Sequence, residues 1–257
     1  MLQKDIVCKR RTAVLGLTFL AGNFYLSSSW AQENTINVVT EEWAPYNYTE
    51  NGVLKGFSVE IIQAIAKRLN QNIQIQFLPS MRATHILDNV PKTMQITMFR
   101  TPEREDKYKW IGPLGDGDIY FYKKKGNPLV ISNLEDAKKV KKIACRHGGL
   151  VLNLLRAANF NNLDASSTDG ISVYKKLLID RCDLGISDTP LGVKHQLRKL
   201  DYPADALVQT AVKVVELPLY IACSKDIPDQ EILLWQKALD EMKASGLYAN
   251  IYKKYNE

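Results

Sequence analysis

The chain has 257 residues, of which 46% are hydrophobic and 24% are charged, and its formal net charge is +6. This length and composition suit one large domain or two modest ones with real hydrophobic cores, and they exclude an intrinsically disordered chain. The basic residues are scattered apart from short lysine-rich runs at 123–125 and 138–142, so the charge gives little support to nucleic-acid binding.

The first 31 residues have the three-part pattern of a secretory signal peptide. Basic residues up to position 11 precede an apolar run over residues 13–26, and Ser29-Trp30-Ala31 is a small-x-small site for cleavage before Gln32. The run is short for a bilayer span and contains polar residues, which favours a cleaved signal over a membrane anchor. Asn23 stands where a lipoprotein would need cysteine. We therefore expect a periplasmic protein that is not lipid-anchored.

Three cysteines remain after removal of this segment, which is an odd number for an oxidising compartment. At most one intramolecular disulfide is possible, and the apolar neighbours of Cys145 and Cys223 make buried free thiols at least as plausible as a bridge that includes Cys182. The sequence gives no reason to expect a metal site or a cofactor.

Strands and helices alternate in the first part of the mature chain. Residue alternation predicts strands at 35–40, 73–77 and 94–99. Apolar residues at helical spacing predict a helix over 59–70 capped by Ser58, and Pro79 opens a second helix that runs towards Asp88. This order predicts a mostly parallel sheet covered by helices, with ligands at the carboxyl ends of its strands.

An aromatic and a cationic residue follow two of these strands. Trp43 comes after the first strand, and Arg104 follows the third, just beyond Pro102, which suits the first turn of a helix. Arginine can hold a carboxylate by two parallel hydrogen bonds, and helix N–H groups would add to the attraction. Alternatively, Arg104 pairs with a glutamate on a solvated helix start, and Trp43 is a core aromatic.

The segment 112–118 interrupts this pattern and predicts a domain border. Beyond it we expect strands at 119–122 and 142–145. We also expect a short helix from Asn133 and two further helices over 151–158 and 170–178. The tight turn Arg146-His147-Gly148-Gly149 either offers backbone N–H groups to a ligand or is an ordinary turn with a surface imidazole. A short buried strand then ends on Asp188, which places a second polar group at a strand end.

The last part of the chain returns to the same pattern. Residues 219–225 predict a strand, Asp229 caps an amphipathic helix that Gly246 closes, and residues 247–255 predict a further short helix.

Five segments carry motifs that are specific when taken together: residues 41–46 (EEWAPY), 56–60 (GFSVE), 100–105 (RTPERE), 180–183 (DRCD) with Asp188, and 238–248 (ALDEMKASGLY). Jointly they resemble the bacterial extracellular solute-binding proteins of family 3, periplasmic receptors that hand polar amino acids to ABC importers. The resemblance covers essentially the whole mature chain.

The fold implied by this resemblance is α/β and two-lobed, of the periplasmic-binding-protein-like type II, with a ligand cleft between lobes joined by two crossing strands. It implies a signal peptide over residues 1–31, a first lobe over 32–116 and 217–257, and a second lobe over 117–216. It also implies a monomer without cofactors whose partners are a small ligand and the permease subunits of an ABC transporter in the inner membrane.

The resemblance also implies roles for individual residues. Arg104 would grip the ligand's α-carboxylate, Asp188 would take its α-ammonium, Trp43 would cover its side chain, and the turn at Gly149 would contact the carboxylate. Two further binding positions are Thr97 and Phe99. Phe99 and Gly149 stand where many relatives carry hydroxyl residues, so two donors are missing.

Four more residues are additional candidates: Tyr46, Arg82, Arg100 and His147. Arg82 and Arg100 could equally pair with glutamates on the surface. The sequence thus predicts a binding protein that closes on a small polar ligand and is not an enzyme. The alternatives are an enzyme on the same scaffold, such as the cyclohexadienyl dehydratases, with His147 or Glu42 as general acid, or a receptor for a sensor or chemotaxis protein.

Overall fold

The computed structural model describes residues 35–256. The predicted signal peptide, residues 1–31, lies outside the described residues. Within residues 35–256, no helix is long and apolar enough to cross a membrane.

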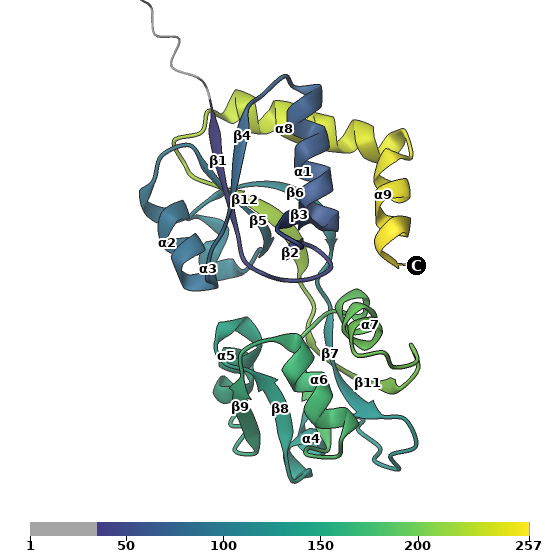
Figure 1. Ribbon diagram of the computed structural model, residues 1–257. Helices are drawn as coiled ribbons and strands as arrows, with labels where there is room; N and C mark the ends of the chain where they lie inside the picture. Colours follow the sequence, from purple (N-terminus) through teal and green to yellow (C-terminus); the bar gives the residue numbers. More distant parts are fainter. Residues whose placement is uncertain (1–34, 257) are drawn as a thin grey trace, which may run out of the picture. The chain divides into compact units, whose positions relative to one another are not determined.

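The first of two mixed sheets is five-stranded (Figure 1). Its strands, in spatial order, are β4 (Ile73–Phe77), β1 (Ile36–Thr40), β5 (Thr93–Phe99), β12 (Pro218–Cys223) and β6 (Lys109–Asp116). β1 is parallel to β4 and β5, whereas β12 is antiparallel to both of its neighbours. The parallel half is the part that the alternation of strands and helices predicted.

Five helices and a hairpin accompany this sheet: α1 (Phe57–Arg68), α2 (Ser80–Asn89), α3 (Pro102–Glu105), α8 (Asp229–Ala244), α9 (Leu247–Asn256), and the strands β2 (Tyr48–Glu50) and β3 (Val53–Lys55). α1 contacts β5 and α8 contacts β6, and the two helices pack on each other and on α9. α2 packs against β1 and β5. Fully buried aliphatic residues of α1 and Trp235 of α8 fill this core.

The second sheet contains, in spatial order, β11 (Leu207–Val215), β7 (Ile119–Lys124), β10 (Leu184–Ile186), β8 (Ile143–Arg146) and β9 (Leu163–Ser167). Its helices are α4 (Leu134–Lys139), α5 (Gly149–Ala157), α6 (Gly170–Leu178) and α7 (Pro190–Lys199). α6 packs against β8 and β10, and α7 packs against α6.

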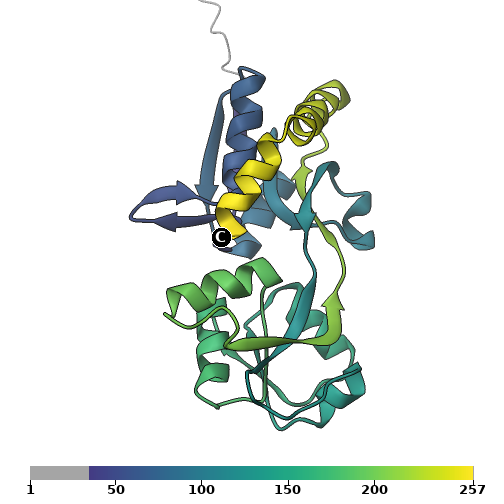
Figure 2. The same cartoon turned by 90° about the vertical axis from the view of Figure 1, so that its right-hand side faces the viewer.

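The chain passes between the sheets twice. It leaves the first sheet after β6, enters the second at β7, and returns from β11 to β12. Figure 2 shows these two connecting segments side by side, in teal and yellow-green. The two-lobed α/β fold with two connecting strands is therefore confirmed. We propose lobe limits at these crossings, at residues 116/117 and 216/217.

Several local predictions need correction. Residues 112–118 were expected to interrupt the pattern, but most of them belong to β6, because this strand lies at the edge of its sheet, where Pro113 need not donate a ladder hydrogen bond. The cap of α8 is Pro228, with Asp229 in the first turn. The cap of α1 is Gly56 and not Ser58. A Cβ at Gly56 would lie 2.2 Å from the Tyr46 carbonyl oxygen, so only glycine fits there.

All three cysteines of the described region are free and buried. Burial raises the pKa of the Cys145 and Cys182 thiols to about 11, and it also raises that of Cys223. Such thiols are unreactive at neutral pH, so these side chains serve as core residues.

Candidate functional site

A buried carboxylate lies between the two lobes. Asp188 follows β10, is 1% exposed, and precedes Thr189, the N-cap of α7. Its backbone N–H donates to the Tyr174 hydroxyl (2.9 Å), and its Oδ1 accepts a hydrogen bond from the Trp43 indole N–H (3.0 Å) of the first lobe. Its Oδ2 has no hydrogen-bond partner among the described residues. This oxygen can accept a hydrogen bond from a donor that the protein does not supply.

Burial raises the pKa of the Asp188 carboxyl above its ordinary value of 3.8, while the positive charge of Arg146, the neighbouring Ser187 side chain and the Trp43 hydrogen bond act in the opposite direction. An ionised carboxylate that is buried without an ion-pair partner carries a desolvation cost. A cationic ligand group placed against it would offset that cost. The site therefore favours a ligand with a positive charge at this position.

Trp43 is held by the loop that follows β1. Its ring lies 5.2 Å from that of Tyr46, and a short turn closes the loop, with the Tyr46 N–H donating to the Trp43 carbonyl oxygen (2.9 Å). The first two N–H groups of α1, on Phe57 and Ser58, donate to the carbonyl oxygens of Pro45 and Tyr46. The start of α1 thus fixes the loop, and the loop fixes the tryptophan.

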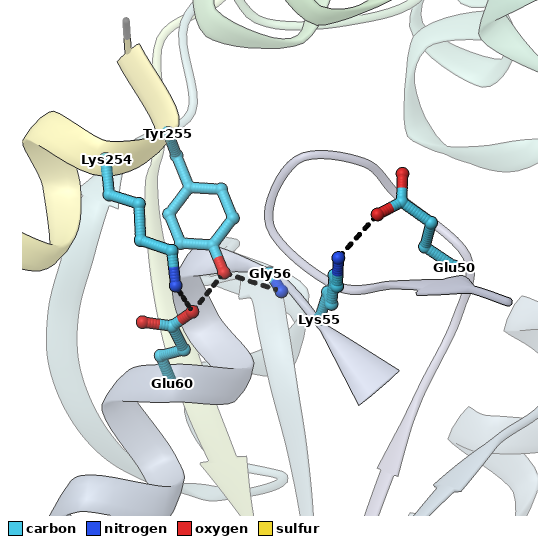
Figure 3. Close-up of polar contacts among 6 residues, drawn as sticks. All are labelled: Glu50, Lys55, Gly56, Glu60, Lys254 and Tyr255. Carbon is cyan, nitrogen blue, oxygen red and sulfur yellow. Dashed lines mark hydrogen bonds and ion pairs between the residues drawn. The ribbon is translucent and has the colours of Figure 1, made fainter. Parts of the chain in front are cut away.

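The C-terminal helix α9 contacts the start of α1. The Tyr255 hydroxyl of α9 accepts a hydrogen bond from the Gly56 N–H (3.1 Å) and donates to Glu60, which also pairs with Lys254 (Figure 3). Residues from α9 therefore stabilise the start of α1, and through it the loop that carries Trp43.

A β-bulge brings Phe99 to Trp43. In the pairing of β5 with β12, Gln95 lies opposite Ala222 and Met98 opposite Tyr220, so two residues of β5 face one residue of β12. Thr97, in the bulge, has φ = +62°, which is unusual for a β-branched residue, and its Oγ1 is buried without a partner. The bulge redirects the chain, and the Phe99 and Trp43 rings lie 5.5 Å apart.

Arg104 lies in α3 directly after this strand and is half-buried. Its Nη1 donates to the Phe99 carbonyl oxygen (3.2 Å), and this is its only side-chain hydrogen bond among the residues that the structure describes. The guanidinium is thus anchored to the end of β5 while most of its N–H groups remain available for an anion.

The predicted turn in the second lobe follows β8. Gly148 and Gly149 have φ of +79° and +83° and are exposed at the start of α5, and His147 is exposed, with its N–H donating to the Ser167 carbonyl oxygen. Arg146 reaches across to Glu41 of the first lobe, with a nitrogen–oxygen distance of 3.6 Å. The positive charge of Arg146 also acts on the Asp188 carboxyl, so this cation stands near it.

The other two arginine candidates, Arg100 and Arg82, have different surroundings from Arg104. Arg100 pairs with Glu105, and its guanidinium lies 5.5 Å from the ring centre of Trp110 and 5.1 Å from that of Tyr220. Arg82 is exposed on α2. Arg100 therefore pairs with a glutamate, as the alternative in the sequence analysis allowed, and Arg82 lies on the surface.

The sequence analysis did not predict some contacts of the site. The Tyr46 hydroxyl hydrogen-bonds the Thr189 hydroxyl (2.8 Å), which joins the lobes beside Asp188. α7 was not predicted, although Thr189 followed by Pro190 is an N-cap signal that could have found it. Within residues 35–256 no group of three His, Cys, Asp or Glu side chains could hold a metal ion.

Comparison with known proteins agrees with this architecture. The family model described as bacterial extracellular solute-binding proteins, family 3, matches residues 36–257. The chain belongs to this family.

This family 3 protein is similar to named binding proteins and to a sensor domain. A probable amino-acid-binding protein, YxeM of Bacillus subtilis (strain 168), is 25% identical over 256 residues, which cover 95% of this chain and 91% of YxeM. The substrate-binding protein of an amino acid ABC transporter has a TM-score of 0.68 at 22% identity, covering 86% of this chain and 98% of its own. A histidine kinase sensor domain with similarity to periplasmic binding proteins has a TM-score of 0.74 at 17% identity, covering 87% and 96%.

A histidine of this solute-binding protein lies where the lobes meet. The His195 ring of α7 is 5.3 Å from the Tyr48 ring of β2. Burial, with the nearby charges of Lys199 and Arg198, lowers the pKa of His195 from 6.5 to about 4, and Glu50 acts in the opposite direction. The charged groups around it come from β2, β3, α1, α7 and α9: Glu50, Lys55, Glu60, Arg198, Lys199 and Lys254.

This histidine predicts a pH dependence of stability. Because its pKa is lower in the folded than in the unfolded protein, the free energy of unfolding falls as the pH drops from about 6.5 towards about 4. We expect His195→Gln to lose less stability than the wild type between about pH 7 and pH 5, as measured by urea unfolding at both values. His85→Gln, an exposed control on α2, should behave as the wild type. Equal losses in wild type and His195→Gln would contradict the assignment.

Proposed function

We propose that this protein captures a small amino acid, or a related zwitterion, between its lobes and delivers it to an ABC importer. Asp188 accepts the ligand's ammonium group, Arg104 holds its carboxylate, and the Trp43 and Phe99 rings cover its side chain. The observation that carries the proposal is the buried Asp188 carboxylate, which has an unpartnered Oδ2 and is contacted by the first lobe through Trp43.

Opposite charges on different lobes give the ligand a reason to favour closure. A ligand shifts the population to the closed form only if it binds that form better, and contacts to both lobes supply the difference. Charge-assisted hydrogen bonds contribute about 1.5–3 kcal/mol each, so three or four of them could sustain near-micromolar affinity after the costs of ordering.

The other candidate residues would add contacts to the ligand or between the lobes. Thr97 offers a buried hydroxyl without a partner, and Tyr46 joins the lobes through Thr189. In the exposed turn, the Gly149 backbone offers a donor to the ligand's carboxylate, and the exposed His147 side chain lies beside it. The family is extracellular, and we propose secretion to the periplasm through the signal peptide at residues 1–31, with the mature protein acting as a monomer at the permease.

A ligand screen tests the proposed function. We expect at least one of the twenty proteinogenic L-amino acids, tested singly, to raise the midpoint of thermal unfolding, because a ligand at a hundred times its dissociation constant adds about 2.7 kcal/mol of stability. Small carboxylates without an amino group should give smaller shifts. If no amino acid changes the midpoint, the proposal is wrong.

A receptor for a sensor protein is the second candidate, and the similarity to a histidine kinase sensor domain favours it. It uses the same ligand site, so a permease and an ATPase encoded beside this gene would distinguish import from signalling. An enzyme has less support. His147 is exposed, and Glu42 is exposed and accepts hydrogen bonds from Thr49, so neither has the buried setting of a general acid. Turnover of prephenate or arogenate would decide for the enzyme.

A further inference from the structure

Two glycines form the walls of the recess that holds the Asp188 carboxylate. Gly170 is the first residue of α6, and Gly192 lies in the first turn of α7. A Cβ atom at Gly170 would lie 2.2 Å from Asp188 Oδ2, and one at Gly192 would lie 2.7 Å from Asp188 Cβ. Both distances are far below van der Waals contact, so neither position has room for a side chain while Asp188 stays in place.

Backbone conformation does not explain the glycine at either position. Neither Gly170 nor Gly192 has a positive φ, so an alanine could adopt the same backbone. Glycine weakens a helix relative to alanine, so it is the less stable choice at both positions. Glycine is required at both positions because a side chain there would occupy the space of Asp188.

The two walls differ in what a side chain would displace. At Gly170 the nearest atoms are side-chain ends: Asp188 Oδ2 at 2.2 Å, Asp188 Cγ at 3.1 Å and Gln196 Nε2 at 3.2 Å. These are side-chain atoms, so a methyl group at Gly170 would displace the carboxylate through its side-chain torsions and not through a shift of the backbone. At Gly192 the nearest atom is Asp188 Cβ, which is bonded to the backbone, so the chain itself would have to shift. Gly170 therefore controls the position of the carboxylate separately from the fold.

We propose that Gly170 is a positioning residue of the ligand site: its lack of a side chain lets the Asp188 carboxylate sit at the depth where it meets both Trp43 and the ligand's ammonium group. The role of the ammonium rests on the proposed function. The contact with Trp43 does not, since it joins two residues of the protein itself. Binding groups work only when held within about 0.5 Å of their productive position, so a displacement of this size disables the site.

The test uses Gly170→Ala, with Gly115→Ala as the matched control. A Cβ at Gly115 in β6 would meet its nearest atoms at 3.7 and 3.9 Å, which are ordinary contacts. Calorimetry with the twenty L-amino acids, one at a time, measures affinity, and thermal unfolding without added amino acid measures stability. We expect Gly170→Ala to bind at least tenfold more weakly than the wild type with an equal or higher unfolding midpoint, and Gly115→Ala to match the wild type.

A second measurement separates this inference from the proposed function. The emission of Trp43, obtained by subtracting the spectrum of Trp43→Phe, reports its hydrogen bond to Asp188 in the protein without added amino acid. It should shift in Gly170→Ala and not in Gly115→Ala.

Each outcome of these measurements decides a different question. If the wild type binds no amino acid but the Trp43 emission shifts as expected, the proposed function fails and the positioning role stands. Unchanged affinity and emission in Gly170→Ala would overturn the positioning role, and so would a loss of affinity that accompanies a large fall in the unfolding midpoint.

Discussion

Asp188→Asn is expected to raise the unfolding midpoint of the ligand-free protein and to abolish stabilisation by the ligand. The carboxyl has a raised pKa in the folded state, so the folded protein binds the proton more tightly than the unfolded chain. Stability is therefore lost as the pH rises from the ordinary value of 3.8 through the folded pKa, and above the folded pKa the ionised side chain is destabilising. Asparagine removes the charge and keeps an oxygen for Trp43.

The size of this effect follows from the cost of a buried group without its partner, which is about 1–3 kcal/mol. In a protein of this length each kcal/mol corresponds to about 2–4 °C in the unfolding midpoint. Scanning calorimetry with and without the amino acid found in the screen measures both changes. The gain in stability should shrink as the pH is lowered.

Asp169→Asn is the matched control for this charge change. Asp169 is the N-cap of α6, and its side chain accepts a hydrogen bond from the Ser172 N–H (2.7 Å), a role that asparagine also fills. It should still bind ligand, with at most a small change in affinity, because the Asp169 charge also acts on the Asp188 carboxyl. An Asp188→Asn protein that is less stable and still binds would rule out Asp188 as the ammonium site.

Arg104→Ala is expected to remove ligand binding with little effect on stability. The one side-chain hydrogen bond of Arg104 within the described region goes to the Phe99 carbonyl oxygen, and the side chain is only half-buried, so the fold loses little. The ligand would lose two charge-assisted hydrogen bonds worth about 1.5–3 kcal/mol each, which corresponds to an affinity roughly a hundredfold to ten-thousandfold weaker. Isothermal titration calorimetry measures the loss.

The neighbouring arginine provides the control. Arg100→Ala removes a cation of the same kind four residues earlier in the chain, but one that pairs with Glu105 and lies against Trp110 and Tyr220. It should cost some stability and leave affinity unchanged. Arg104→Lys should bind weakly, since an ammonium cannot reproduce the paired geometry of a guanidinium. Unchanged affinity in Arg104→Ala would exclude this residue from the site.

Residue periodicity predicted part of the regular elements, but not α7, β9 or β11. β4 occupies residues 73–77 and α6 residues 170–178, as expected, because each has a clear period and a clear boundary residue. It failed at β6, where glycine and proline occupy an edge strand, and at the cap of α1, where a close contact with the Tyr46 carbonyl decides the residue. These are consequences of tertiary position, which local pattern does not contain.

Only part of the site could be predicted from the sequence. Strand ends and charges pointed to Trp43, Arg104 and Asp188, and their roles towards a ligand stay predictions. Strict alternation would place Thr97 and Phe99 on one face of β5, and only the bulge shows why Phe99 meets Trp43. The hydrogen bond between Trp43 and Asp188 joins residues 145 positions apart, and no local signal could reveal it.

The position of β12 also affects the order in which the chain can assemble. This strand pairs with both β5 and β6 in the interior of the first sheet, yet it is the last strand to be synthesised. A nascent chain can complete the second sheet, whose strands all lie between residues 119 and 215, before β12 exists. Until then β6 has no neighbour to pair with. The lobe that starts the polypeptide is thus the one that finishes folding last.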